Sequence, residues 1–305
     1  MRIVLAIGGN ALLQSGDDGT VESQSSRALE SLSHILPLLI SRKKLLLSHG
    51  NGPQVGNALL RAAAGVPQTP YRPLDYLVSD TQGGIGYLLE RTIRNIIKKN
   101  GGEREVMTML AQVKVALDAP SFDVPKKPVG PWFDTNERQK LESKGWFLKQ
   151  TVKGIRRLVS SPKPEEVIEL EIIRSLFENR IICITAGGGG TPVTYNLNEW
   201  QGVEGVIDKD LVSSILAREL NATHLVIATD VDNVWIGPKR EPLGKIGTSK
   251  LSKYLDKGEF PLGSMGPKVQ SALNFVQSEN QTAIITSLPK VMQALEGNAG
   301  TIVHF

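Results

Sequence analysis

Three lysines stand where a fixed positive charge could take part in chemistry. Lys209 and Lys268 both lie at the start of a predicted helix, where a cation opposes the helix dipole unless an anion is bound beside it. Lys127 lies just before Pro128, in a segment that two prolines stiffen. A lysine ammonium is a compact charge with three donors, which suits stabilisation of a phosphoryl group during transfer. The alternative for each lysine is a solvated surface charge.

Aspartates flank the first of these lysines, in the run Asp208-Lys209-Asp210. Either aspartate can cap the helix that begins there, because a carboxylate oxygen accepts from the free N–H groups of a first turn. Either could also hold the ammonium group in place. The run therefore predicts a positioned charge.

Glycine-rich turns follow three of the predicted strands. They are Gly8-Gly9-Asn10-Ala11, His49-Gly50-Asn51-Gly52 and Gly187-Gly188-Gly189-Gly190. Ligands of open α/β sheets bind beyond the carboxyl ends of the strands, and glycine lets backbone N–H groups approach an anion closely. A single turn of this kind would be explained as well by chain geometry alone. Three together predict a phosphate-rich ligand crossing this edge of the sheet.

Several familiar catalytic motifs are missing from the sequence. It has no G-x-x-x-x-G-K-[ST] loop, its first turn is not G-x-G-x-x-G, and it lacks the H-R-D and D-F-G motifs of protein kinases. The four histidines are scattered, and none belongs to H-E-x-x-H, which argues against a histidine metal site. We expect His34 to be structural. His49 lies beside a glycine turn and could orient that turn or contact a ligand.

The composition limits the possible partners. The chain has 305 residues, a formal net charge of +4 and a single cysteine, Cys183. The small surplus of charge, without a basic run interleaved with aromatics, argues against a nucleic-acid binder. No apolar run approaches the roughly 20 residues of a membrane span. A lone cysteine in an apolar run cannot form a disulfide within the chain, so we expect a cytoplasmic protein.

Short apolar runs alternate with helical patterns along the chain. Strands are predicted at residues 3–7, 45–47, 106–110, 181–185, 225–228, 283–286 and 301–303. Helices are predicted at residues 83–99, 165–178, 208–220, 268–278 and 289–295, with a further leucine stripe at 29–39 that Pro37 interrupts. Pro164 would mark the start of the helix at 165–178. This alternation predicts a largely parallel sheet covered on both faces.

One segment departs from the alternation. Residues 118–164 are rich in proline, lysine and aromatic residues. A long surface loop is one explanation, but loops of this length are uncommon unless they are functional. We therefore expect an inserted subdomain, called the lid below.

The motifs together resemble those of the carbamate kinases, within the amino acid kinase superfamily. The resemblance runs through essentially the whole chain. Its segments are residues 8–11, 48–56, 81–87, 127–131, 187–190, 206–210 and 263–268, of which those at 81–87 and 127–131 are similar to blocks particular to carbamate kinases. It implies an α/β fold, a three-layer αβα sandwich with a mainly parallel central sheet and the lid inserted. It also implies one domain over residues 1–305, with an N-terminal lobe of about 1–180 and a C-terminal lobe of about 181–305.

The resemblance further implies an activity and its partners. A homodimer would transfer a phosphoryl group between ATP and carbamate, giving ADP and carbamoyl phosphate, with Mg²⁺ held through the nucleotide phosphates. The N-terminal lobe would bind carbamate or carbamoyl phosphate through Gly8, Gly9, Asn10, Gly50, Asn51 and Gly52. The C-terminal lobe would bind the nucleotide through Gly187, Gly188, Thr229, Asp230, Val231, Met265 and Pro267. Lys127, Lys209 and Lys268 would be catalytic, with Asp210 orienting the last two.

The sequence departs from the family pattern at three positions. Lys153 replaces an arginine and Ile155 a tryptophan, while Ala186 stands where serine is frequent. The first two changes bear on docking of the lid and on the acceptor. Two other functions stay open: a kinase of another small acid or phosphate in the same superfamily, and a nucleotide-binding sensor or storage protein without turnover. The physiological direction of the reaction is not encoded in these motifs.

Overall fold

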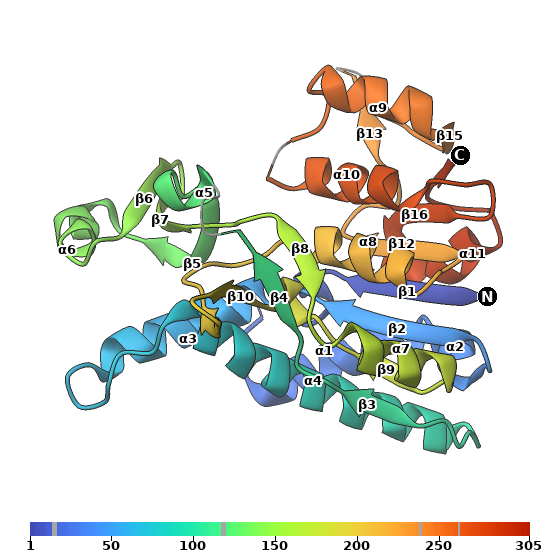
Figure 1. Cartoon of the computed structure of the whole chain (residues 1–305), viewed down its shortest axis with the longest axis horizontal. Coiled ribbons are helices and arrows are strands. Elements are labelled where there is room, and N and C mark those ends of the chain that lie inside the picture. Colours follow the sequence, from blue (N-terminus) through green and yellow to red (C-terminus); the bar gives the residue numbers. More distant parts are fainter. Residues whose placement is uncertain (14–16, 117–119, 238–239, 262) are drawn as a thin grey trace.

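The computed structural model describes residues 1–13, 17–116, 120–237, 240–261 and 263–305. Its centre is an eight-stranded sheet in the order β15-β17-β16-β12-β1-β2-β9-β3 (Figure 1). Neighbouring strands are parallel except for β16 with β17. The strands are β1 (Arg2–Ile7), β2 (Lys44–His49), β3 (Val106–Thr108), β9 (Ile182–Ile184), β12 (His224–Thr229), β15 (Lys245–Gly247), β16 (Thr282–Ser287) and β17 (Thr301–His304). The predicted mainly parallel sheet is confirmed.

Helices cover both faces of this sheet, because alternate strand residues point to opposite sides. Val4 and Leu46 belong to the apolar core on one face, and Ile3 and Leu45 to the core on the other. The first face carries α7 (Leu170–Glu178), α8 (Lys209–Glu219), α9 (Thr248–Asp256) and α10 (Met265–Phe275). The second carries α1 (Val21–Ser33), α2 (Leu36–Ile40), α4 (Leu74–Lys99) and α11 (Val291–Leu295). The fold is the expected three-layer αβα sandwich.

A second sheet lies beside the carboxyl ends of the central strands. It has four strands in the order β11-β10-β4-β8, namely β4 (Gln112–Val115), β8 (Pro164–Val167), β10 (Thr191–Asn196) and β11 (Glu199–Gly202). Helix α3 (Gly52–Gly65) packs with the start of α4 against the lid, in a small apolar core of its own that includes Val55, Leu77 and Val129. A short β13 (Trp235–Ile236) pairs with β14 (Glu241–Pro242).

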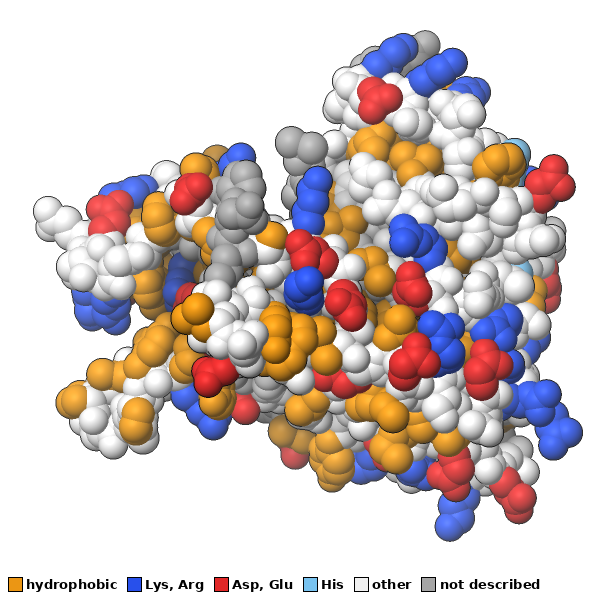
Figure 2. Space-filling view, in the orientation of Figure 1, with side chains coloured by type: hydrophobic (Ala, Val, Ile, Leu, Met, Phe, Trp, Pro, Cys, Tyr) orange, Lys and Arg blue, Asp and Glu red, His pale blue; other side chains and the backbone are white. Residues whose placement is uncertain are grey.

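The lid folds as a small antiparallel sheet rather than as a surface loop. It contains α5 (Pro120–Asp123), β5 (Lys127–Phe133), α6 (Arg138–Glu142), β6 (Phe147–Thr151) and β7 (Gly154–Val159), with strand order β5-β7-β6. It projects from the body in Figure 1, and Figure 2 shows a deep notch between it and the layer of α9 and α10. The predicted first residues of this segment, 118 and 119, lie outside the described ranges.

The lid rests on α3 where two glycines meet. A Cβ on Gly56 would lie 2.4 Å from the Cα of Gly130, whose φ is +76°. Only glycine at residue 56 allows the two backbones to come this close, because a side chain there would collide with residue 130. Beside it, Arg157 stacks on Trp146 with 4.5 Å between the guanidinium carbon and the ring centre. The lid therefore has a defined seat on the body.

Several predicted helices have different bounds in the structure, and the one predicted at 268–278 is α10, at Met265–Phe275. Pro164 starts a strand, β8, and the helix begins only at Leu170. The prediction of one helix from 165 was wrong because β8 is an edge strand, where the missing N–H of proline is tolerated. The helix predicted from residue 83 begins at Leu74 instead, straight through Gly83 and Gly84.

Candidate active site

A cleft of about 330 Å³ opens at the carboxyl ends of β1, β2, β9 and β12. Predicted site residues that line it are Gly8, Gly9, Gly50, Asn51, Gly52, Lys127, Gly188, Lys209, Asp210, Thr229, Asp230 and Lys268. Others do not line it, namely Gly187, Val231, Met265 and Pro267. The side chain of Asn10 is outside what the structure describes. Residues predicted for two different ligands thus meet in one cleft.

Asp210 joins two of the predicted lysines. The Lys209 ammonium donates to its Oδ1 at 2.5 Å, and the Lys268 ammonium donates to its Oδ2 at 2.7 Å. The Asp210 side chain is only 4% exposed, so this pair of contacts lies in a desolvated environment. Lys209 and Asp210 come from the first turn of α8, and Lys268 from the first turn of α10. Two helices therefore deliver two cations to one carboxylate.

The charges of this cluster stabilise one another. Burial alone would raise the pKa of Asp210, but the two lysines hold it well below its usual range. Burial works to lower the pKa of Lys268, and its attraction to Asp210 outweighs that effect and raises it. Burial lowers the pKa of Lys209 despite the same carboxylate, and repulsion from Lys268 contributes. Two positive charges are thus fixed around one negative charge.

The third lysine reaches the cleft from the lid. Lys127 is the first residue of β5, and its ammonium donates to Asp208 Oδ2 at 2.7 Å. Asp208 is also the N-cap of α8, because its Oδ1 accepts from the backbone N–H of Asp210 at 3.0 Å. The predicted cap is therefore confirmed for Asp208. The sequence run suggested either role for an aspartate but not that one residue fills both.

Two other helix starts face the cleft without a side-chain cap. Helix α3 has Asn51 as N-cap, yet the Asn51 amide donates to Thr81 Oγ1 at 2.9 Å. Helix α10 has Ser264 as N-cap, again without a capping side-chain bond. Gly52 and Ser264 both line the cleft. Two helix N-termini with their positive dipole ends therefore border it, an arrangement suited to anions.

Several of the glycines are required by packing. Gly188 has φ of +65°, and a Cβ there would lie 2.2 Å from the Asn51 amide nitrogen. A Cβ on Gly187 would lie 2.3 Å from the His49 ring, and one on Gly50 would lie 2.6 Å from the Gly9 nitrogen. The three glycine turns therefore pack against one another at the end of the sheet. Their glycines bring the loops together as well as exposing backbone.

His49 is completely buried beneath this glycine layer. Its Nδ1 lies 3.2 Å from the Gly50 carbonyl, and burial lowers the pKa of the imidazole to about 4. It does not line the cleft. Of the two roles left open by the sequence, the contacts favour orientation of the turn.

The block at residues 81–87 has a structural explanation. Gln82 is buried, its amide nitrogen donates to the Ala111 carbonyl and to Thr191 Oγ1, and its amide oxygen accepts from the Ala111 N–H. These bonds tie α4 to the second sheet. Thr81 holds Asn51, as described above. Thr81 and Gln82 therefore help to hold in place the loops and strands that surround the cleft. The spacing of the block in the sequence did not predict this role.

The three departures from the family pattern lie away from the lysine cluster. Lys153 is exposed in the turn between β6 and β7, and Ile155 is fully buried in the lid. Ala186 precedes the glycine run with a left-handed φ of +52°, and its carbonyl accepts from Ser48 Oγ at 3.0 Å. Two departures thus concern the lid's own fold and one the loop after β9.

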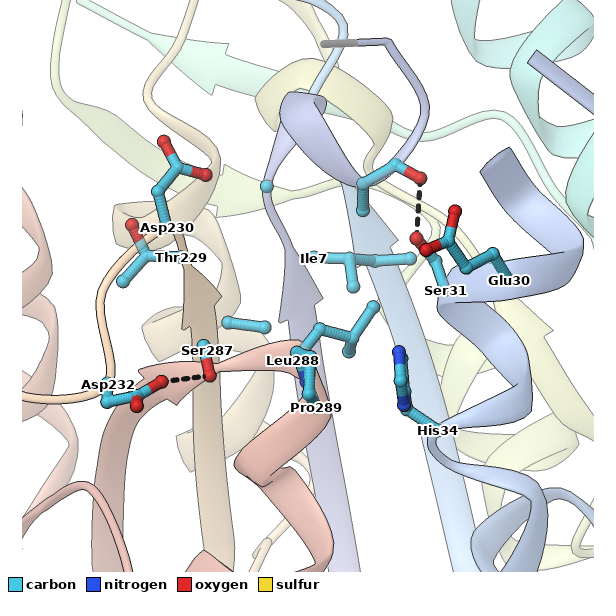
Figure 3. Close-up of a pocket in the computed structure, with 13 residues that line it drawn as sticks. Ile7, Glu30, Ser31, His34, Thr229, Asp230, Asp232, Ser287, Leu288 and Pro289 are labelled. Atoms are coloured by element: carbon cyan, nitrogen blue, oxygen red, sulfur yellow. Dashed lines mark hydrogen bonds between the residues drawn. The ribbon is translucent and has the colours of Figure 1, made fainter. Parts of the chain in front are cut away.

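A second, wider cleft of about 640 Å³ opens on the α1 side of the same strand ends. It shares Gly8, Thr229 and Asp230 with the first cleft. Figure 3 shows Glu30 and His34 facing it from the end of α1, opposite Ser287, which donates to Asp232. His34, which we expected to be structural, is exposed there.

No helix within the described ranges has the length and apolar character to span a bilayer. Cys183 is a free, buried thiol of β9, and burial raises its pKa to about 12.

Known sequences and structures match the chain over nearly its whole length. The amino acid kinase family model matches residues 1–287. Carbamate kinase from Pyrococcus horikoshii is 42% identical, with 99% of this chain and 98% of that protein covered. Carbamate kinase 2 from Staphylococcus aureus is 39% identical, with 99% of each covered.

Solved structures agree. Carbamate kinase from Giardia lamblia bound to citric acid has a TM-score of 0.94 and 35% identity, and the form bound to AMP-PNP has a TM-score of 0.92. Both comparisons cover 99% of this chain and 98% of that chain. An isopentenyl phosphate kinase from T. acidophilum, at 15% identity and a TM-score of 0.53, shares the fold alone. The chain therefore belongs to the amino acid kinase family and, within it, to the carbamate kinases.

Proposed function

We propose that the chain catalyses reversible phosphoryl transfer between ATP and carbamate, giving ADP and carbamoyl phosphate. The observation that carries the proposal is the cluster of Lys127, Lys209 and Lys268 in one cleft. Asp208, Asp210 and Asp230 line the same cleft, so its formal charges balance, and two of these carboxylates hold the three ammonium groups in place. Ammonium groups positioned in this way can stabilise the phosphoryl group that is transferred.

The chemistry needs charge stabilisation more than proton transfer. In the direction of carbamate phosphorylation, a carbamate oxygen forms a bond to the γ-phosphorus as the bond from that phosphorus to the ADP oxygen breaks. Carbamate is already an anion, so no base has to remove a proton. Lys209 and Lys268 stabilise charge on the moving phosphoryl group. Asp210 keeps both ammonium groups in place, so little reorganisation is required during the reaction.

The two uncapped helix starts support a division of the cleft between the substrates. The N-terminus of α3, with Gly52 and Asn51, would hold carbamate or the carbamoyl end of carbamoyl phosphate. The N-terminus of α10, with Lys268, would hold nucleotide phosphates, and Thr229 and Asp230 would hold the rest of the nucleotide. Gly187, Val231, Met265 and Pro267 remain predicted nucleotide contacts. Gly8, Gly9, Asn10 and Gly50 remain predicted acceptor contacts.

The cleft fits a divalent cation that enters with the nucleotide. Both oxygens of Asp210 accept from lysines, and those of Asp208 accept from Lys127 and a backbone N–H. Within the described part of the chain, no group of three or more His, Cys, Asp or Glu side chains is arranged for a metal. Phosphate oxygens would therefore supply most ligands. Mg²⁺ held in this way would neutralise part of the polyphosphate charge.

We also propose that the enzyme is a homodimer in the cytoplasm. An apolar groove of about 500 Å³ runs between α1, α3 and α4, and Tyr87 of α4 is 63% exposed beside it. An exposed aromatic next to a groove is typical of a protein interface. Tyr87→Asp should shift sedimentation from dimer to monomer, and a dimer that withstands this change would speak against the groove.

A coupled assay of ATP formation from ADP and carbamoyl phosphate tests the proposed activity. The wild-type protein should form ATP, and Lys127→Ala should raise the KM for carbamoyl phosphate roughly tenfold or more, because a bond to a charged group is lost. Absence of ATP formation would overturn the proposal. An acceptor screen with ATP completes the test, since a better acceptor than carbamate would favour another small-acid kinase. Nucleotide binding without turnover on any acceptor would favour a sensor.

A further inference from the structure

We propose that Asp208 is a positioning residue that couples the lid to the phosphoryl-transfer helix, by holding Lys127 with one carboxylate oxygen and capping α8 with the other. This inference rests on the proposed function. It concerns the acceptor side of the cleft, because Lys127 enters from the lid. Asp208 itself need not touch either substrate for this role.

The geometry gives Asp208 two separate tasks. Its Oδ2 lies 2.7 Å from the Lys127 ammonium, and its Oδ1 lies 3.0 Å from the N–H of Asp210. The side chain is 14% exposed, and that of Lys127 is 32% exposed. The pair is therefore shielded from water on most sides, where a charged hydrogen bond is stronger than at the surface.

The electrostatics extend from this pair to the catalytic cluster. The Asp208 carboxylate acts to raise the pKa of Lys209 and also that of Lys268. The Asp208 carboxylate thus interacts electrostatically with both Lys209 and Lys268, while it accepts a hydrogen bond from Lys127. Loss of its charge would leave three ammonium groups in the cleft against Asp210 and Asp230, and Lys127 would lose its ion-pair partner and move outward on its flexible stem.

The held ammonium can still serve a ligand. An ammonium group has three N–H donors, and the bond to Asp208 uses one of them. Lys127 lines the cleft together with Gly52 at the start of α3. Asp208 therefore fixes the direction of a cation whose remaining donors are available to the acceptor. An anion in the cleft and a seated lid then favour each other.

Three substitutions separate the two tasks. Asp208→Asn and Asp208→Ser keep an oxygen that can cap α8 but remove the charge that holds Lys127. Both should raise the KM for carbamoyl phosphate roughly tenfold and leave the KM for ADP within about twofold. Asp208→Ala removes the cap as well and should add a loss in kcat. A purely structural role would instead change the three kinetic constants together in all variants.

A double-mutant cycle tests whether Asp208 acts through Lys127. In a Lys127→Met background, Asp208→Asn should cause no further rise in the KM for carbamoyl phosphate. Additive effects in this cycle would overturn the proposal. Glu142→Gln is the matched control, since it removes a carboxylate of the lid whose partner, Arg138, lies on the exposed helix α6. This control should leave both KM values unchanged.

Hydrogen exchange gives a readout that does not depend on turnover. The backbone amides of β5 should exchange faster in Asp208→Asn than in the wild type or in Glu142→Gln, because the lid loses its ionic tie to α8. Unchanged exchange of β5 would overturn the coupling. If the wild type formed no ATP from carbamoyl phosphate, the proposed function would fail. The exchange experiment would still decide whether Asp208 holds the lid.

Discussion

The lysines of the cleft lie in two contrasting settings. Lys209 and Lys268 come from helices packed on the central sheet, and they share a nearly inaccessible carboxylate. Lys127 comes from a three-stranded sheet that projects from the body, and it forms an ion pair with Asp208. The first setting keeps charges in place before any ligand arrives. We propose that the lid carries the second kind of charge in and out of the cleft with a ligand, so we expect these fixed and delivered cations to affect different kinetic constants.

Removal of a fixed cation should give the largest effect. Lys268→Ala should lower kcat roughly 10²–10³-fold, by analogy with loss of one charge-stabilising donor in other active sites. The KM for carbamoyl phosphate should change much less. Steady-state assays of ATP formation measure both constants. Lys253→Ala, an exposed lysine of α9, is the control. A correctly folded Lys268→Ala protein with near-full turnover would contradict the assignment of Lys268 as a catalytic residue.

Displacement of the lid should have a smaller effect, confined to the acceptor. Gly56→Ala would place a methyl group against the Gly130 backbone and force the lid off α3. We expect a rise of roughly tenfold in the KM for carbamoyl phosphate, comparable to loss of the Lys127 contact. Gly83→Ala is the matched control, because its Cβ would meet no atom within 4 Å. If the KM for carbamoyl phosphate were equal in the two variants, the lid would have no separate effect on the acceptor, and the distinction between fixed and delivered cations would be wrong.

Acid should destabilise the buried side of the site through His49. His49 has a folded pKa of about 4 against an ordinary value of 6.5, so the unfolded chain takes up a proton first as the pH falls. The contribution of His49 to stability is therefore complete above pH 6.5 and lost towards pH 4, a change of about 3 kcal/mol. Denaturant unfolding across this range measures it. His49→Gln should flatten the profile, and an unchanged profile would contradict the buried neutral imidazole.

The smallest effect is expected at the tip of the lid. Lys153 is exposed in a turn, where substitutions usually change stability by less than about 0.5 kcal/mol. Lys153→Ala should therefore change kcat and both KM values by less than about twofold. The same coupled assay measures them. A large loss would mean that this tip takes part in binding the acceptor.

The sequence contained enough information to predict the edge of the sheet where the site lies. Apolar runs followed by glycine turns predicted β1, β2 and β9 and the loops after them. The charged run at 208–210 predicted a capped helix start with a positioned lysine, and the structure confirms both. These features are local, so neighbouring residues were sufficient to recognise them.

Long-range contacts could not be predicted in the same way. The pair of Lys127 and Asp208 spans 81 residues, and the pair of Asn51 and Thr81 spans 30. Neither separation corresponds to a helical or strand repeat, so sequence periodicity could not indicate that these residues are in contact. The strand at Pro164–Val167 was mistaken for helix for a related reason, because its partner β4 lies far along the chain.

The glycines illustrate a further limit of sequence reasoning. A glycine can be required because another part of the chain packs closely against it, or because its backbone N–H must be accessible to a ligand. The sequence alone does not distinguish these two reasons. Gly187 is required by the His49 ring, whereas a Cβ on Gly52 would meet no atom within 4 Å. A Gly52→Ala variant thus probes backbone exposure at the cleft, and a Gly187→Ala variant probes packing.

The buried position of Cys183 makes the protein convenient for spectroscopy. It is the sole cysteine of the sequence, and within β9 it is inaccessible to thiol reagents. A cysteine introduced in place of Val152, a fully exposed residue of the lid, would therefore be labelled selectively in the otherwise unaltered chain. A fluorophore there could report opening and closing of the lid as each substrate is added.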